Sequence, residues 1–386
     1  TMATYKEQNK LNVPHLRFPK FYGEWCVSTI GEQFDLYSGN TPSRLNKEHF
    51  DGNVNWITSG ELKEHYISDT KEKISEDAAT ANNLKLLHPG TFVIAIYGLE
   101  ADGVRGTGSI TCKESTISQA CMAFTQKGDV KNEFLYSWYK KHGNIIGIKY
   151  AQGTKQQNLS YDILEKFHIA YPSQDEQDKL IQFISLLDER IATQSKLIEK
   201  LESLIKGIAQ HCIRELINGW EYVRLGDICK ITTGKLDANA QVENGQYLFF
   251  TCAERPFNID SYAFDTEALL ISGNGANLGY INYYKGKFNA YQRTYVLDHF
   301  SVNIQYVKWA LKVLLPQRIA IEKSSSNTPY IVLSTLADLK IPIPNNSKQN
   351  HIADLMMSFE RKLSTQLALS DLYNKQKQYL LRQMFI

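Results

Sequence analysis

A seven-residue repeat of apolar residues between positions 175 and 217 constrains this chain more than any other feature. Its apolar positions follow one another at steps of four and three residues, and Gln194 fills the single gap. A 3.5-residue period held over about four heptads is typical of a coiled-coil seam. At 1.5 Å per residue, such a helix extends roughly 60 Å, which is too long for the core helix of one small domain. We therefore expect it to space other parts of the chain and to pack against a partner helix.

The C-terminal stretch 347–385 is the predicted partner, because the same frame recurs there after a shift of 172 positions. The alternative is a pair of unrelated amphipathic helices, which a shared frame makes the weaker interpretation. The predicted seam positions of the two helices are Leu180, Ile184, Leu187, Ile191, Gln194, Ile198, Leu201, Ile205 and Ile208, and Ile352, Met356, Phe359, Leu363, Gln366, Tyr373 and Leu380.

Polar residues inside this seam carry two further predictions. Gln194 and Gln366 share one seam position, so we expect their amides to meet if the helices pair antiparallel. A buried polar residue in a seam fixes the alignment of the helices at some cost in stability. Ser370 and Lys377 also fall at seam positions, and there we expect the seam to drift onto Leu369 and Gln376.

The remainder of the chain repeats as well, and this sets the number of domains. Residues 25–32 line up with 220–227 at an offset of 195, and residues 164–172 line up with 336–344 at an offset of 172. We therefore predict an α+β protein with two similar globular domains, mostly antiparallel sheets and an internal pseudo-twofold repeat. Residues 117–124 are predicted to form one of the strands of the first domain. The long helices separate the globular domains and form an antiparallel coiled coil. The predicted boundaries are 1–172 and 219–345 for the globular domains and 173–218 and 346–386 for the helices.

Composition is that of a soluble protein with reduced thiols. The longest apolar run, near residues 91–99, is far too short to span a bilayer, and no basic start precedes an apolar core. The six cysteines form no CxxC pair and have no nearby His, so we interpret them as reduced cytosolic thiols rather than disulfides or zinc ligands. We expect a cytoplasmic protein without a metal site.

Charge limits what the chain can bind alone. Its 43 Lys and Arg residues are balanced by 41 Asp and Glu residues, which leaves a net charge of +2. A protein that binds DNA without help usually has a stronger basic excess. Any contact with DNA must therefore use a local basic surface or depend on partner subunits for phosphate contacts.

No stretch of the sequence supplies a convincing catalytic site. Residues 327–330, Asn-Thr-Pro-Tyr, resemble the Asn-Pro-Pro-Tyr loop of adenine aminomethyltransferases, but Thr replaces the first Pro and no glycine-rich turn for S-adenosylmethionine accompanies them. Residues 273–279 read GxGxxxG rather than GxGxxG and precede a predicted strand, and no GxxxxGK[ST] is present. We expect no catalytic residue in this chain, while a stand-alone enzyme is kept as an alternative.

Polar, glycine-containing loops suit the reading of base edges. Asn, Gln and Arg side chains supply paired donors and acceptors, and glycine allows close backbone approach. The candidate DNA-contacting residues are Arg44, Arg105, Thr154, Lys155, Gln156, Gln157 and Asn158 in the first domain, and Lys235, Arg255, Asn274, Asn277, Gln292, Arg293 and Asn327 in the second.

Several motifs in order resemble the DNA-specificity subunit of Type I restriction-modification enzymes. They are the Trp-x4-[Leu/Ile]-Gly-[Glu/Asp] start of each domain, the run 56–62, the loop 153–159, and the glutamines Gln177 and Gln349 that open the long helices. The resemblance covers nearly the whole chain. It implies two target recognition domains, each reading half of a split double-stranded DNA target, held apart by the coiled coil.

The same resemblance implies the partners and the cofactor. Two modification subunits would carry S-adenosylmethionine and methylate adenine, translocating restriction subunits would join them, and this chain would hold no cofactor. A coiled-coil adaptor or assembly scaffold without base readout stays the alternative function, and it would show the same helices without any DNA contact.

Overall fold

The computed structural model describes residues 12–101, 103–153, 157–215, 220–323 and 330–386. The chain forms two compact units, one of residues 1–193 with 370–386 and one of residues 194–369. Both units combine helices with mostly antiparallel sheets, so the predicted α+β class with two similar domains is confirmed. Within the described residues, no helix is both long and apolar enough to cross a membrane. The unit boundaries fall inside the two long helices, and the domain boundaries given above stay a prediction.

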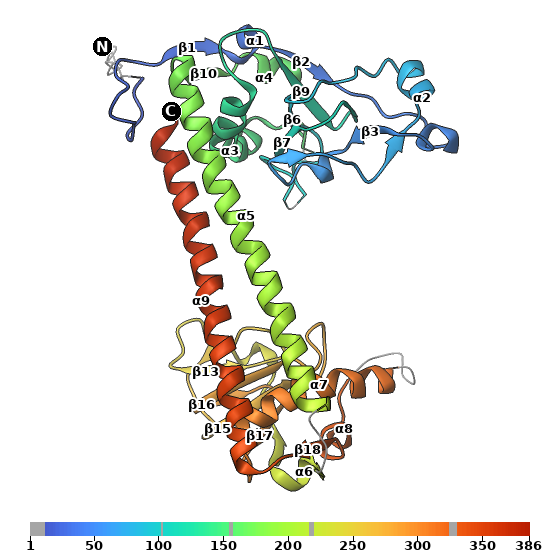
Figure 1. The fold of residues 1–386 in the computed structure, drawn as a ribbon, viewed down its shortest axis with the longest axis vertical. Coiled ribbons are helices and arrows are strands. Elements are labelled where there is room, and N and C mark those ends of the chain that lie inside the picture. The colour runs from blue at the N-terminus through green and yellow to red at the C-terminus, as the bar shows by residue number, and fades with distance from the viewer. Residues whose placement is uncertain (1–11, 102, 154–156, 216–219, 324–329) are drawn as a thin grey trace, which may run out of the picture. The chain divides into compact units, whose positions relative to one another are not determined.

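The first unit is built on a five-stranded sheet of order β2-β9-β6-β7-β4, beside a three-stranded sheet of order β5-β3-β8. Its longest helix other than the coiled-coil segments, α3, lies beside β6 and β7 (Figure 1). The strands are β1 (Cys26–Thr29), β2 (Phe34–Ser38), β3 (Val54–Ile57), β4 (Tyr66–Ile67), β5 (Lys73–Ile74), β6 (Phe92–Ala95), β7 (Gly108–Thr111), β8 (Ser115–Ile117), β9 (Cys121–Gln126) and β10 (His168–Tyr171), and the helices are α1 (Ile30–Gln33), α2 (Glu76–Ala81), α3 (Asn132–Tyr150) and α4 (Tyr161–Glu165).

The second unit carries one six-stranded sheet of order β12-β17-β15-β16-β13-β14. Helix α7 packs on β15 and β16. The strands are β11 (Glu221–Arg224), β12 (Lys230–Thr233), β13 (Tyr247–Phe250), β14 (Phe257–Ile259), β15 (Phe264–Ser272), β16 (Ile281–Ala290), β17 (Thr294–Asp298) and β18 (Lys340–Ile343), and the helices are α6 (Leu225–Ile228), α7 (Ile304–Lys323) and α8 (Leu333–Ala337).

Two long helices run through both units, α5 (Gln174–Gln210) and α9 (Asn346–Met384). In the first unit Arg190 donates to the Tyr373 hydroxyl at 2.6 Å, while Leu180 shares a core with Leu380. In the second unit Gln194, at the start of its part of α5, contacts Gln366, near the end of its part of α9. The two helices are therefore antiparallel inside each unit.

The seam glutamines meet as predicted. The Gln194 side-chain nitrogen donates to the Gln366 side-chain oxygen at 2.9 Å and to its backbone carbonyl at 3.1 Å. The seam is expected to drift onto Leu369 and Gln376. Leu369 is half-buried, as is Ser370, but the drift onto Gln376 is wrong, because Gln376 is exposed and Lys377 keeps the half-buried seam position. Lys377 can stay there because it pairs with the Asp188 carboxylate across the seam.

Burial of the predicted seam positions differs along the two helices. Most of those in α5 are buried and most of those in α9 are half-buried, so the packing is tighter on the first helix. The buried positions are Leu180, Ile184, Gln194, Ile198, Leu201, Ile205, Ile352, Met356 and Leu380, and the half-buried ones are Leu187, Ile191, Ile208, Phe359, Leu363, Gln366 and Tyr373.

The repeat seen in the sequence is also a repeat of hydrogen-bond register. Strand β1 pairs antiparallel with β10, and Cys26 faces Tyr171; β11 pairs antiparallel with β18, and Glu221 faces Ile343. These pairs differ by the same offsets, 195 and 172, that relate the sequence motifs. The first and last strands of the globular part therefore pair in the same way in the two units, which confirms the internal repeat.

Gln177 fastens the start of α5 to the first unit. Its side chain is fully buried. Its oxygen accepts a hydrogen bond from the Lys131 backbone N–H at 2.9 Å, and its nitrogen donates to the carbonyls of Pro172 and Asp129 at 3.0 and 3.1 Å. A single side chain thus joins the residue before α3, the end of β10 and the long helix.

Gln349 makes the equivalent connection at the start of α9. Its oxygen accepts from the Asn303 N–H at 3.0 Å and its nitrogen donates to the Pro344 carbonyl at 2.8 Å. Asn303 and Pro344 lie 172 positions after Lys131 and Pro172, the partners of Gln177. The two glutamines therefore make equivalent hydrogen bonds in the two units.

Candidate nucleic-acid interface

One β-turn occurs at the same place in both units. In the first unit the Cys121 N–H donates to the Ser118 carbonyl at 3.0 Å as β9 begins; in the second, the Thr294 N–H donates to the Tyr291 carbonyl at 2.8 Å as β17 begins. The sequence prediction of one strand across residues 117–124 is wrong here, because the chain turns between β8 and β9.

A loop that follows the central strand meets each turn. The Ile96 N–H donates to the Ala120 carbonyl at 2.9 Å, and the Gly273 N–H donates to the Arg293 carbonyl at 2.8 Å. The loop that precedes α4 or α8 joins at the same point, since residue 159 donates to Ile96 and residue 331 donates to Gly273 at 2.9 and 2.8 Å. Three segments far apart in sequence therefore meet at one end of the main sheet in each unit.

A glycine in each unit lets a fourth segment lie close to the backbone just before the turn. A Cβ added to Gly39 would lie 1.8 Å from the Ile117 carbonyl oxygen, and one added to Gly234 would lie 1.9 Å from that of Ala290. Such distances are impossible for a side chain, so both positions require glycine. We call these four segments, in either unit, the turn cluster: residues 39–41, 96–101 with 103–107, 118–120 and 157–159 in the first unit, and 234–236, 273–279, 291–293 and 330–331 in the second.

Most of the predicted residues of the second unit gather at its turn cluster. Gln292 and Arg293 form the turn, and the Gln292 N–H donates to the Leu236 carbonyl at 2.9 Å, next to Lys235. Asn277 donates from its side chain to the Cys252 carbonyl at 3.1 Å, three residues before Arg255. Asn274 bridges to Tyr330. Asn327 lies outside the described residues.

The first unit holds only some of its predicted residues at the turn cluster. Arg105 donates to the Gln157 side-chain oxygen at 2.7 Å, and the Gln157 N–H donates to the Glu100 carboxylate at 2.7 Å. Asn158 pairs with Gln152 through their backbones. Thr154, Lys155 and Gln156 lie outside the described residues.

Arg44 lies apart from the others, on a small apolar cluster around Trp56. Its guanidinium makes two hydrogen bonds of 2.8 Å to the Glu72 carboxylate and lies over the rings of Phe50 and Trp56, 4.8 and 5.6 Å from their centroids. The hydrogen bonds from Arg44 lower the pKa of Glu72. Two of the five N–H donors of Arg44 are used by Glu72, so a bidentate contact between that edge of the guanidinium and DNA would compete with Glu72.

The structure adds residues that sequence reasoning missed. Gln119 is exposed in the turn of the first unit, and its side-chain oxygen accepts a hydrogen bond from the Thr41 hydroxyl. Asn40, also exposed, follows Gly39 as Lys235 follows Gly234. The repeated glycine could have revealed Asn40 from sequence, whereas Gln119 was hidden inside the run predicted to be a strand.

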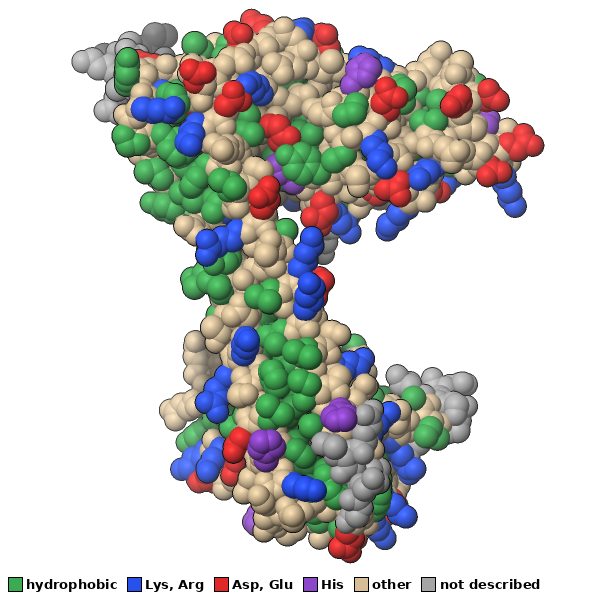
Figure 2. All heavy atoms as spheres, viewed as in Figure 1, with side chains coloured by type: hydrophobic (Ala, Val, Ile, Leu, Met, Phe, Trp, Pro, Cys, Tyr) green, Lys and Arg blue, Asp and Glu red, His purple; other side chains and the backbone are tan. Residues whose placement is uncertain are grey.

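Charge on the surface is mixed. On the face drawn in Figure 2, Lys and Arg side chains are interspersed with Asp and Glu side chains, so no patch of one sign dominates that face. The net charge of the chain is also only +2, so recognition at the turn clusters would depend on amide and guanidinium groups at defined positions rather than on a broad positive field.

A half-buried ionic cluster connects the first unit to its helices. The ring of His65 is stacked between Tyr66 and Tyr136, with centroid distances of 4.1 and 3.9 Å, and its nitrogens lie 2.8 and 3.4 Å from oxygens of Glu133 and Asp188. Burial alone would lower the pKa of His65, but its hydrogen bonds to the two carboxylates outweigh burial and raise it. His65 is therefore held toward its charged form.

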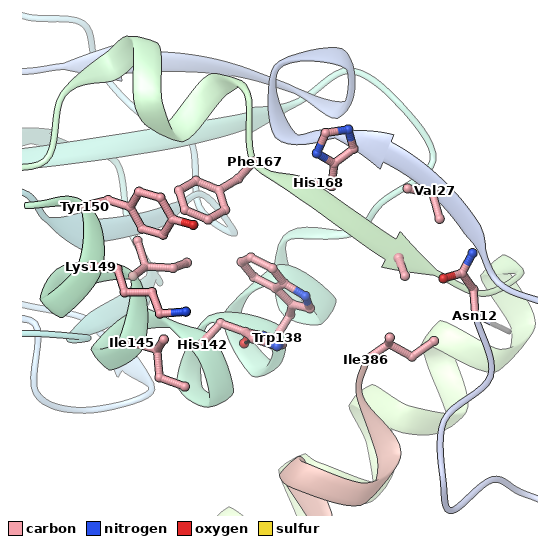
Figure 3. A pocket seen from close by; sticks show the side chains of 12 residues that line it. Asn12, Val27, Trp138, His142, Ile145, Lys149, Tyr150, Phe167, His168 and Ile386 are labelled. Atoms are coloured by element: carbon pink, nitrogen blue, oxygen red, sulfur yellow. Dashed lines mark hydrogen bonds between the residues drawn. The ribbon is translucent and has the colours of Figure 1, made fainter. Parts of the chain in front are cut away.

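One cavity of about 370 Å³ lies in the first unit beside the two-stranded sheet of β1 and β10. Figure 3 shows Trp138, His142, Tyr150 and Phe167 around it, and the rings of Tyr150 and Phe167 meet edge to face at 4.9 Å. Burial lowers the pKa of His142 to about 4, so its ring is neutral at pH 7. This apolar cavity uses elements other than those of the turn cluster.

Comparison with known proteins gives one family over both units. The chain matches the Type I restriction modification DNA specificity domain twice, over residues 22–203 and 217–369. It is 43% identical over 149 residues to the Type I restriction enzyme EcoDI specificity subunit of Escherichia coli, a match that covers 39% of this chain and 31% of that protein. It is 24% identical over 364 residues to the MjaIX specificity subunit of Methanocaldococcus jannaschii, which covers 83% of each.

Solved structures share the fold. The S subunit of a Type I restriction-modification system from M. genitalium aligns with a TM-score of 0.64 at 19% identity, over 97% of this chain and 99% of that one. A chain from a structure of complex assembly and conformational transition of the type I R-M system aligns with a TM-score of 0.59 at 17% identity, over 92% and 96%.

Proposed function

The chain belongs to the Type I restriction modification DNA specificity family, and on that premise we propose that it is the DNA-recognition subunit of a Type I restriction-modification complex. Each unit reads one half of a bipartite target in double-stranded DNA. The observation that carries this proposal is the turn cluster, which recurs with the same hydrogen bonds in both units and gathers Gln, Asn and Arg side chains. Such side chains match the donors and acceptors of base edges in the major groove.

The chain contributes recognition, and its partners contribute the reaction. Two modification subunits bind S-adenosylmethionine and methylate adenine, and restriction subunits join the complex through them. Leu197 and Leu204 support docking on the helices, because they lie seven residues apart on α5 and are 48% and 52% exposed. Figure 2 shows hydrophobic side chains gathered over this part of α5. We therefore also propose a cytoplasmic location, where the DNA target and the partner subunits would be found.

Methylation-sensitive sequencing tests the proposal directly. Cells that express this chain with its modification subunit should methylate adenines in one bipartite sequence, and cells that express the modification subunit alone should not. A methylation pattern that does not depend on this chain would refute the proposal. Binding of the purified complex to duplexes with and without the mapped target distinguishes base readout from an adaptor, because an adaptor would bind both alike.

A further inference from the structure

Gln119 and Gln292 occupy the same position in the two units. Each is the second residue of its turn, each side chain is exposed, and each turn leads into the strand next to the central one. The residues that follow them differ, Ala120 in the first unit and Arg293 in the second. The turn thus presents one shared amide and one variable neighbour.

An amide that recurs at one position of two different reading surfaces matches something that the two half-sites share. A Gln side chain pairs bidentately with adenine, accepting from N6 and donating to N7 in the major groove. No other base offers this donor and acceptor pair in the same arrangement. The variable neighbours then read bases in which the half-sites differ.

We propose that Gln119 and Gln292 are equivalent specificity-determining residues, each of which reads an adenine in the half-site of its own unit. This inference rests on the proposed function and adds which residue reads which base. It also places Gln119, which sequence reasoning missed, in the recognition surface of the first unit.

Thr41 positions the glutamine in the first unit only. Its hydroxyl donates to the Gln119 side-chain oxygen, which keeps a second lone pair for adenine N6. In the second unit Leu236 lies beside the turn, and the Gln292 side chain makes no hydrogen bond to any residue that the structure describes. Loss of the Thr41 hydroxyl therefore affects one half-site and leaves the other intact.

The experiment compares the full complex of this chain and its modification subunits with complexes that contain Gln119→Leu, Gln292→Leu or Thr41→Val. Genome-wide methylation maps give the base preference at every position of both half-sites. Binding to duplexes in which one adenine at a time is replaced by 7-deazaadenine, which lacks the N7 acceptor, then tests the contact itself. Gln126→Leu and Gln246→Leu are matched controls, because both side chains are exposed and lie away from the turns. Gln126 ends β9, which begins at the first turn, and Gln246 precedes β13, whose other end contacts the second turn.

Each glutamine variant should lose about 5- to 150-fold in preference for adenine at one position of one half-site, in the range expected of one bidentate contact. At that position 7-deazaadenine should weaken binding of the wild-type complex and leave the matching variant unaffected. Thr41→Val should relax the first half-site alone, and the two controls should keep the wild-type pattern.

Unchanged preferences in both glutamine variants would overturn this assignment while the proposed function stands. Equal weakening at all sequences would also overturn it, since that result indicates a phosphate contact. If the wild-type chain directs no methylation, the proposed function fails and this assignment fails with it.

Discussion

Replacing Gln177 by Ala is expected to destabilise the first unit strongly. The substitution removes an acceptor from the Lys131 N–H and a donor from the buried Pro172 carbonyl, at hydrogen bonds of 2.9 and 3.0 Å. The Asp129 carbonyl keeps a partner, because Gln174 also donates to it at 3.2 Å. Two unsatisfied groups at about 1–3 kcal/mol each give a loss of about 2–6 kcal/mol. For a unit of this size, the midpoint of unfolding would fall by roughly 4–24 °C.

Thermal unfolding of the full chain by calorimetry, together with hydrogen exchange read by mass spectrometry, measures this effect and locates it. The Lys131 amide and the end of β10 should exchange faster in the variant, while the second unit should be unchanged. Gln174→Ala is the matched control, because its side chain is exposed and makes one longer hydrogen bond to the same region. A loss in Gln177→Ala no larger than in Gln174→Ala would refute the reasoning.

Gln177→Glu separates the donor from the acceptor. A carboxylate keeps the acceptor for the Lys131 N–H but faces the Pro172 and Asp129 carbonyl oxygens without a proton to donate. At neutral pH this variant should be at least as unstable as Gln177→Ala. Protonation restores one donor, so the gap between the variant and the wild type should narrow as the pH falls.

Three further outcomes are expected. Gln194→Leu combined with Gln366→Leu should raise the midpoint of thermal unfolding and loosen helix alignment, because a buried polar pair fixes register at some cost in stability; a lower midpoint would contradict this. His65 has a raised pKa in the folded state, so its stabilisation is complete below about pH 6.5 and is lost as the pH rises through the folded pKa; unfolding midpoints across pH 5.5–8.5 should show this decline in the wild type and lack it in His65→Gln. Replacing residues 220–340 by the matching region of a relative should change one half of the methylated target, and a change in both halves would refute independent reading.

The helices and the repeat were predictable from sequence because both rest on patterns that repeat at fixed spacing. The 172-residue offset that aligned Gln194 with Gln366 also relates the hydrogen-bond partners of Gln177 and Gln349. The drift onto Gln376 failed for a local reason. A Lys at a seam position reads as a break in an apolar pattern, yet the Asp188 carboxylate across the seam makes that position favourable for Lys377. The heptad pattern of apolar residues predicts apolar packing, but it does not predict an ion pair between residues of two separate helices.

The recognition surface was only partly predictable. Loop composition identified Gln292 and Arg293, which the structure brings together with Asn274 and Asn277. It missed Gln119, because the run from Ile117 to Phe124 is apolar enough to pass for one strand. A turn without glycine or proline leaves no local mark, and it becomes visible only through the hydrogen bonds that tie it to distant segments.

Asp188 and Glu360 show how one scaffold can hold two different reading surfaces. They are 172 positions apart, and each forms an ion pair with a basic side chain from the globular part of its own unit. Asp188 lies beside His65, the residue that directly precedes β4. The Glu360 carboxylate instead forms ion pairs with the side-chain nitrogens of Lys308 and Lys312 on α7, at 2.6 and 3.0 Å. The acidic group stays fixed on the long helix while its cationic partner comes from whichever element the unit supplies. Attachment to the helix therefore makes no demand on the residues of the turn cluster, so the bases read by one unit can change without loosening its hold on the scaffold.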